Sequence, residues 1–298
     1  MNGVINVYKE AGVTSFQVVA AVRKIFNVKK TGHTGTLDPM AEGVLPICLG
    51  SATRFADILT AGDKQYIAHF KLGQSFDTFD TTGTVRETSD KIPSKDDIIK
   101  ALQEMTGETE LVVPAFSAKK IDGKRAYELA RKGDLEDAGT ALMRIDRIEL
   151  LSYDYPEGVF VIDCGKGTYV RSVIHKLGLV TGAFAAMSGL IRSKNGPFLL
   201  ADAVKLDDIR VAVDEGRAAG ILRPVQDVLD IPKFTVSDGA AKRLMNGISP
   251  KVNEFTSLPS AVPGSLCLLM NQKGELLALG EFKGGSTPVK LSKVFNAP

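Results

Sequence analysis

Residues 32–39 form a segment that cannot continue as a regular helix or strand. It reads GHTGTLDP, with glycines at 32 and 35 and a proline at 39. Glycine permits backbone conformations that other residues resist, while Pro39 fixes its own φ and biases Asp38 toward an extended conformation. One acid, Asp38, therefore lies in a stiff loop just before the apolar run Val44–Leu49. The segment fits a polar turn and also a loop that presents a carboxylate, and composition alone leaves both open.

Hydrophobic periodicity elsewhere predicts mixed α and β structure. Ser94 and Asp97 have the spacing of a capping box, and Gly107 is placed to end the helix that they begin. We expect a further helix opening at Thr14 or Ser15 and helices over 52–59, 169–177 and 206–215. Strands are expected over 4–8, 44–49, 66–72, 142–152 and 159–163.

A domain boundary is expected near 229–232, which divides the 298 residues into domains 1–230 and 231–298. In the second domain Ser237 can cap a helix that contains Leu244 and Met245. Strands are expected over 266–270 and 275–280, joined by an Asn-Gln-Lys-Gly turn, and over 289–294.

Charge is nearly balanced overall but concentrated locally. The chain has 37 Lys and Arg against 35 Asp and Glu, a net charge of +2. Segment 117–133 gathers basic side chains around an aromatic one: Lys119, Lys120, Lys124, Arg125, Tyr127, Arg131 and Lys132. Such a cluster attracts nucleic-acid phosphates, although most charge runs are solvated helix faces.

Other patterns exclude several classes of function. The three cysteines are far apart, and the three histidines lack metal-ligand spacing, so we expect neither a disulfide framework nor a metal site. The segment around Gly165 lacks the first glycine of a P-loop, and nothing indicates a nucleotide cofactor. The chain has no membrane-spanning run and no signal-peptide layout, which favours a cytoplasmic protein. The segment that contains Asp77 and Asp80 lacks a full set of calcium ligands and is interpreted as a structural loop that shapes a cleft.

Several motifs, in order and spacing, resemble the TruB family of tRNA pseudouridine synthases. The family's catalytic aspartate falls on Asp38. The other matching segments are 8–15 (YKEAGVTS), 63–66 (DKQY), 167–171 (GTYVR), and 190–192 (LIR) with 196–198 (GPF). The resemblance implies an α+β fold with a mixed, largely antiparallel sheet of the pseudouridine synthase type. It also implies an RNA-gripping insertion over 117–133 and a small β-rich PUA-like RNA-binding domain over 231–298.

The implied reaction breaks the N-glycosidic bond of uridine, rotates the base and forms a carbon–carbon glycosidic bond, without a cofactor. Asp38 would act as nucleophile or as general base, and both remain open. Arg171 would orient Asp38 bidentately. Tyr66 would stack on the uracil, and Tyr169 would line the pocket.

The resemblance also assigns the remaining site residues and the substrate. The target, uridine 55 in the T-loop of tRNA, must flip out of its stack, and His33 would help to fill the space it leaves. Leu190 and Arg192 would belong to the pocket. Lys9 and Lys64 would serve either the loop framework or the path of the phosphates. We expect a monomer without an obligate protein partner or a membrane.

Some positions depart from the family pattern: Glu10, His175-Lys176, Phe184 and Ile191 replace residues that are usual there. None of them removes Asp38, Tyr66 or Arg171. Two alternatives stay open at this point. One is a non-catalytic RNA-binding protein or tRNA-folding chaperone, and the other is a guide-RNA-dependent enzyme of the same family.

Overall fold

A computed structural model of the protein describes residues 1–117, 120–121, 124–126 and 138–295. The chain divides into two compact units, Met1–Leu222 and Arg223–Pro298. The division falls at residue 222, whereas the sequence suggested residue 230. Helix α7 (Val225–Val228) and the buried Leu229 therefore belong to the second unit.

The first unit is built on one nine-stranded sheet. Its main path runs β1-β3-β12-β4-β11-β10-β7, while β2 pairs with β3 and β13 with β12. All of these pairings are antiparallel except that between β12 and β3. The mixed, largely antiparallel α+β fold is therefore confirmed. The strands are β1 (Gly3–Lys9), β2 (Thr31–His33), β3 (Glu42–Leu49), β4 (Lys64–Leu72), β7 (Gly107–Val112), β10 (Thr140–Asp154), β11 (Glu157–Cys164), β12 (Ala185–Asn195) and β13 (Phe198–Leu199).

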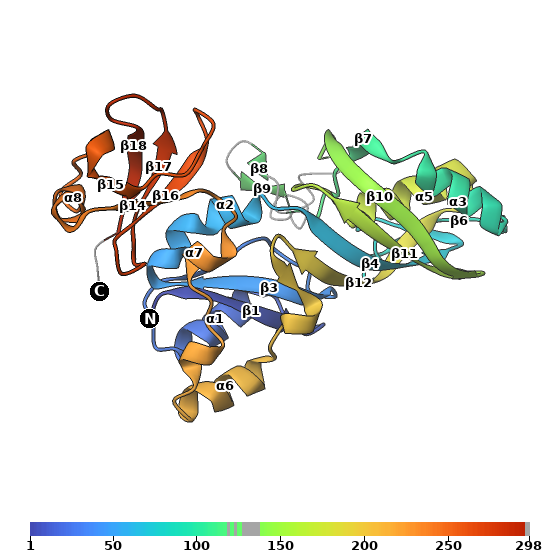
Figure 1. The fold of residues 1–298 in the computed structure, drawn as a ribbon. Helices are drawn as coiled ribbons and strands as arrows, with labels where there is room; N and C mark the ends of the chain where they lie inside the picture. Colours follow the sequence, from blue (N-terminus) through green and yellow to red (C-terminus); the bar gives the residue numbers. More distant parts are fainter. Residues whose placement is uncertain (118–119, 122–123, 127–137, 296–298) are drawn as a thin grey trace. The chain divides into compact units, whose positions relative to one another are not determined.

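Helices cover the sheet at two places (Figure 1). Helices α1 (Ser15–Ile25) and α6 (Leu206–Asp214) pack together beside β1 and β3, while α3 (Lys95–Gln103) and α5 (Val170–Thr181) pack together near β10 and β12. Short two-stranded pairs join β5 (Gln74–Phe76) to β6 (Val85–Thr88), and β8 (Lys120–Ile121) to β9 (Lys124–Arg125). Among the helices of the described residues, none has the length and apolar character needed to cross a membrane.

Strand β4 shows how the sheet faces its core. Tyr66, Ala68, Phe70 and Leu72 are buried in alternation, as the sequence predicted. The Phe70 ring lies 6.1 Å from the ring of Phe160 on the neighbouring strand β11. Tyr66 is nearest to the start of its strand and therefore stands at the end of this buried row.

Local signals placed most helix starts correctly. The Thr14 hydroxyl accepts the Gln17 N–H in a capping box that opens α1, and Ser94 and Asp97 form the same arrangement before α3. Helix α5 begins at Val170, after Tyr169, and ends at Thr181, where Gly182 with φ +68° caps it.

Two predicted helix boundaries were wrong. Helix α3 ends at Gln103, and Gly107, with φ +101°, begins β7 instead of ending the helix. The helix expected over 52–59 is a 3₁₀-helix over Gly50–Phe55 followed by α2 (Ala56–Thr60). The Thr53 hydroxyl donates to the Gly50 carbonyl at 2.7 Å, which suits the tighter turn.

The second unit contains a five-stranded sheet in the order β15-β14-β16-β17-β18. Ser237 caps α8 (Asp238–Leu244), and the Asn271 side chain accepts two backbone N–H groups in the turn between β16 and β17. Both features were predicted. The strands are β14 (Lys233–Val236), β15 (Phe255–Ser257), β16 (Leu266–Met270), β17 (Leu276–Phe282) and β18 (Val289–Val294).

Gly43 and Gly107 provide a matched test of the contact between β3 and β12, because both have φ +101°. A Cβ on Gly43 would lie 2.4 Å from the Arg192 carbonyl oxygen, whereas one on Gly107 would meet nothing within 4 Å. Gly107→Ala should lower the free energy of unfolding by at least about 1 kcal/mol through backbone strain alone. Gly43→Ala should lower it clearly more, because the clash adds to the strain. Urea unfolding of both variants measures the difference, and equal losses would contradict the close approach.

Candidate active site

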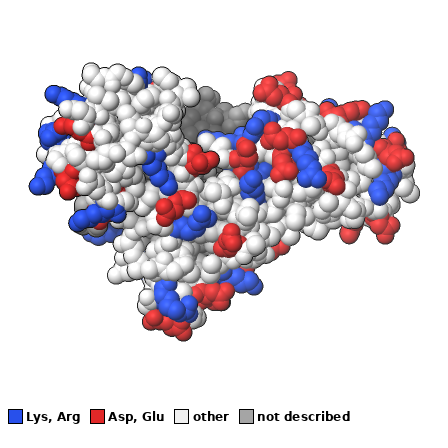
Figure 2. All heavy atoms as spheres, in the orientation of Figure 1, with Lys and Arg blue, Asp and Glu red and all other residues white. Residues whose placement is uncertain are grey.

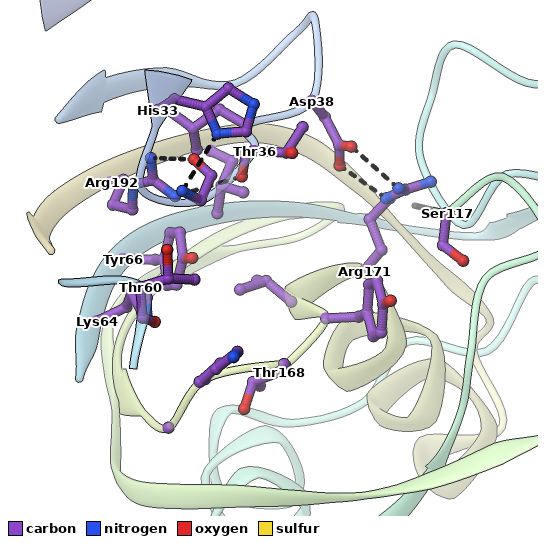
Figure 3. A pocket seen from close by; sticks show the side chains of 18 residues that line it. His33, Thr36, Asp38, Thr60, Lys64, Tyr66, Ser117, Thr168, Arg171 and Arg192 are labelled. Atoms are coloured by element: carbon purple, nitrogen blue, oxygen red, sulfur yellow. Dashed lines mark hydrogen bonds and ion pairs between the residues drawn. The ribbon is translucent and has the colours of Figure 1, made fainter. Parts of the chain in front are cut away.

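A cavity of about 540 Å³ lies in the first unit, where loop 34–41 meets the start of α5 (Figure 3). The side chains of most of the predicted site residues line it: His33, Asp38, Lys64, Tyr66, Tyr169, Arg171, Leu190 and Arg192. They come from β2, the loop, β4, α5 and β12, which are distant in sequence. The sheet therefore brings together what the sequence could only place on separate motifs.

Asp38 is held by Arg171 in a bidentate ion pair. The Arg171 Nε lies 3.0 Å from Asp38 Oδ2, and Nη2 donates to Oδ1 at 3.1 Å. The Arg171 side chain is 6% exposed and that of Asp38 34%, so the carboxylate is the member of the pair that faces solvent. Charge-assisted bidentate pairing fixes both the position and the orientation of a carboxylate.

Arg171 is itself held from behind. Its Nη1 donates to the Thr78 carbonyl at 3.0 Å, and Nη2 donates to the Phe116 carbonyl at 3.0 Å. A second carboxylate, that of the buried Asp80, lies 3.5 Å from Nη1. One guanidinium thus faces two acids, of which only Asp38 borders the cavity.

Asp80 was interpreted from the sequence only as part of a structural loop, so its contact with Arg171 was missed. Its Oδ1 accepts hydrogen bonds from Thr78 Oγ1, from Thr82 Oγ1 and from the Thr82 N–H. The available signal was two acids among threonines in a turn, which is also ordinary turn chemistry. Arg171, which pairs with Asp80, is far away in the sequence and lies on a different element.

Arg192 supports loop 34–41 through hydrogen bonds to the backbone. It is 1% exposed, and its guanidinium donates to the carbonyls of Val44 at 2.7 Å, Gly35 at 3.0 Å and Thr36 at 3.3 Å. Figure 3 shows Arg192 beside the loop, on the opposite side of the cavity from Arg171. Because these partners are uncharged backbone carbonyls, Arg192 shapes the loop and its positive charge remains close to the cavity.

Lys9 also supports the loop. The side chain is fully buried, and its ammonium donates to the carbonyls of Glu10, Pro39 and Ala41 at 2.5–3.1 Å. Burial lowers the pKa of Lys9 to about 8. Of the two roles left open by the sequence, the loop framework is the one that this geometry fits.

Lys64 lies at the border of the cavity, with only 6% of the residue exposed. Its ammonium donates to the carbonyls of Thr60 and Gly62, both at 2.5 Å. Burial lowers the pKa of Lys64 to about 8, and the charge of Arg192 acts in the same direction. Lys64 therefore presents to the cavity an ammonium that is already engaged with backbone.

Three further predicted residues line the cavity. Tyr66 is 9% exposed, and burial raises the pKa of its hydroxyl. Leu190 on β12 adds an apolar surface, and His33 Nδ1 accepts the Gly35 N–H at 3.2 Å. The cavity thus combines the partly exposed Asp38 carboxylate with aromatic rings, aliphatic side chains and buried cations.

The basic insertion is described only in part. Lys120, Lys124 and Arg125 lie on β8 and β9, for which the structure describes the backbone. Lys119, Tyr127 and Arg131 lie outside the described residues. In the described part of the chain, no group of three or more His, Cys, Asp or Glu side chains could hold a metal ion.

Comparison with known proteins places this architecture in a family. Residues 23–170 match the model of the TruB family pseudouridylate synthase, N-terminal domain. The tRNA pseudouridine synthase B of Symbiobacterium thermophilum is 42% identical over 256 residues, which cover 85% of this chain and 84% of that protein. That of Pelotomaculum thermopropionicum is 38% identical over 306 residues, which cover 100% and 96%.

A solved structure agrees with these relatives. The structure of an H/ACA RNP bound to a substrate RNA containing 2'-deoxyuridine has a chain that is 28% identical. It superposes with a TM-score of 0.76 over 99% of this chain and 85% of that one. With the identity and coverage of its relatives, and with the family's motifs gathered around one cavity, this chain belongs to the TruB family of pseudouridine synthases.

Proposed function

We propose that this pseudouridine synthase modifies tRNA at uridine 55 of the T-loop, with Asp38 as the catalytic residue. The observation that carries the proposal is the Asp38 carboxylate, fixed by Arg171 at the border of a cavity that Tyr66 also lines. A cavity of about 540 Å³ is within the range of small-ligand sites and suits one nucleotide flipped out of its stack.

The reaction balances without a co-reactant. The bond from the ribose C1' to N1 of uracil breaks, the base turns, and a bond from C1' to C5 forms. The C5 hydrogen leaves as a proton, and N1 gains one. A single carboxylate can serve this sequence either as a nucleophile or as a general base, and its role in both cases depends on being held in one orientation.

The second acid does not make the site a glycosidase. Hydrolysis by paired carboxylates needs two acids that both reach the scissile bond, with room for water. Asp80 has a side chain only 7% exposed, and its oxygens are occupied by Arg171, Thr78 and Thr82. We propose that Asp80 positions Arg171 and thereby Asp38, and does not touch the substrate.

Tyr66 is proposed to stack on the flipped uracil, with Leu190 and Tyr169 bounding the base. Arg192 and Lys9 would act indirectly by holding the loop. His33 lies at the other edge of the loop and would face the RNA from which the base has left. This distribution gives direct substrate contact to Asp38, Tyr66, Tyr169 and Leu190, which line the cavity, and excludes Lys9, which is buried and does not line it.

The tRNA substrate is supported by the names of the relatives, which are 38–42% identical and are tRNA pseudouridine synthases B. The guide-RNA-dependent alternative is represented by the H/ACA RNP structure, whose matching chain is 28% identical. We therefore favour direct action on tRNA by a monomer. The second unit is proposed to be a PUA-like RNA-binding domain.

Asp38→Asn should abolish pseudouridine formation and leave tRNA affinity within a few-fold of the wild type. The amide keeps the shape of the side chain but loses the charge that both proposed chemistries require. Release of tritium from tRNA that contains uridine labelled at C5 measures turnover, and filter binding measures affinity. Asp77→Asn is the matched control, because Asp77 accepts the Thr84 N–H and so caps the loop without contacting Arg171. Substantial turnover by Asp38→Asn would refute the assignment.

Tyr66→Leu should reduce turnover more than binding, whereas Tyr66→Phe should retain most of the stacking. Base–aromatic stacking is worth roughly 1–3 kcal/mol, which predicts a loss of about five- to 150-fold when the ring is removed. Single-turnover rates at saturating enzyme compare the two variants. If the leucine variant has wild-type activity, Tyr66 is not a stacking platform.

Neutralising Lys119, Lys120, Lys124 and Arg125 should weaken tRNA binding and flatten its dependence on salt. Each lost phosphate contact should reduce the slope of log affinity against log salt by about 0.7–0.9. On the face shown in Figure 2, basic and acidic side chains are interspersed, so the proposal depends on this local cluster rather than on net charge. Lys95→Ala combined with Lys100→Ala, on the exposed side of α3, controls for general charge loss. An unchanged slope in the quadruple variant would identify the cluster as a solvated face.

A further inference from the structure

The loop that brings Asp80 to Arg171 is held a second time, by an aromatic contact away from the cavity. The Phe79 ring lies on the imidazole of His175, with ring centroids 3.9 Å apart and planes 7° apart. Both side chains are half-buried, and neither of them lines the cavity. The reaction proposed above gives neither residue a role.

The two contacts come from one face of one helix. Arg171 and His175 are four residues apart on α5, so their side chains are neighbours on successive turns. Arg171 binds the Thr78 carbonyl and the Asp80 carboxylate, and His175 covers the residue between them. Two consecutive turns of helix α5 therefore contact three consecutive residues of the loop, 78–80.

Phe79 has an unusual backbone conformation that needs such support. Its φ is +62°, in the left-handed region that bulky side chains rarely occupy. Its carbonyl accepts the Met187 N–H at 3.0 Å, and the Thr81 N–H donates to the Met187 carbonyl at 3.0 Å. A conformation of this kind persists when surrounding contacts over-determine it, and such sites cluster near functional groups.

The charges around His175 favour the neutral ring. Burial lowers the pKa of His175, and the adjacent Lys176 acts in the same direction, while Glu87 on β6 opposes them. A neutral imidazole offers a flat face to the phenyl ring without bringing a second cation next to Arg171. The stack is thus compatible with the charge balance of one guanidinium and two carboxylates.

We propose that His175 is a positioning residue for pseudouridine formation. By stacking on Phe79 it fixes loop 77–84, which holds Asp80 against Arg171, and so fixes the orientation of Asp38. The inference rests on the role proposed above for Asp38. A stack that served stability alone would leave the rate of the chemical step unchanged in the folded enzyme.

His175→Ala should lower kcat on unmodified tRNA about ten- to hundredfold, with the Kd for tRNA within about twofold of the wild type, because a small misplacement of a reacting group is costly. His175→Phe retains a flat ring and should restore kcat to within about threefold of the wild type. Val173→Ala, a buried core position on the same helix, controls for loss of stability and should keep kcat.

A double-mutant cycle tests the route through Asp80. If His175 acts through that carboxylate, His175→Ala combined with Asp80→Asn should be no more than about twofold slower than Asp80→Asn alone. Losses that multiply would show that His175 acts by another route and would overturn the proposal.

Hydrogen exchange separates this proposal from the proposed function. Without RNA, His175→Ala should accelerate exchange at the amides of Thr81 and Met187 by about tenfold relative to the wild type. Unchanged exchange, or unchanged kcat, overturns the positioning role of His175 even if Asp38→Asn is inactive. Residual turnover by Asp38→Asn instead overturns the role of Asp38, and the exchange rates then decide whether His175 fixes the loop.

Discussion

Buried cations that bind backbone carbonyls hold the Asp38 loop in place. Arg192 donates hydrogen bonds to the carbonyls of Gly35 and Thr36, and Lys9 donates to those of Pro39 and Ala41. Buried carbonyls require donors, and a stiff loop rich in glycine cannot supply them by forming a helix or a strand. The buried cations meet that need. Loop and cations therefore form one structural unit, and truncating either cation would leave buried polar groups without partners.

Above this unit, Asp38 belongs to a chain of polar contacts that leads away from solvent. The exposed end is the Asp38 carboxylate, the middle is Arg171, and the buried end is Asp80 with its threonine hydroxyls. A guanidinium between two carboxylates cannot rotate freely without breaking several bonds. Such an arrangement gives the carboxylate at the cavity a fixed direction before any substrate arrives, which is the requirement for efficient proton transfer or nucleophilic attack.

Local signals in the sequence were enough for most elements, whereas the side chains of the cavity were assigned through the resemblance to the TruB family. The alternation in 66–72, the Ser94 capping box and the Asn271 turn each depend on residues close together in the chain, and all three are confirmed. The predicted end of α3 was wrong because a glycine such as Gly107 can begin a strand as readily as it can end a helix. Lys9 and Asp80 make contacts that could not be predicted, for a different reason. Their partners are about 30 and 90 residues away, so burial and pairing of these charges emerge only from the fold.

The parallel pairing of β12 with β3 extends over two residue pairs only, Ile191 with Glu42 and Arg192 with Gly43. On one side of this seam lie β1, β2 and β3, which carry the Asp38 loop, and on the other lie β4 and the strands beyond it. Helix α5, with Arg171, packs on that other side. The Asp38–Arg171 pair therefore joins elements from the two sides of this short parallel pairing. The geometry of the active site is in this sense a property of both sides of the sheet, because the carboxylate and its arginine are carried by elements on opposite sides of the seam.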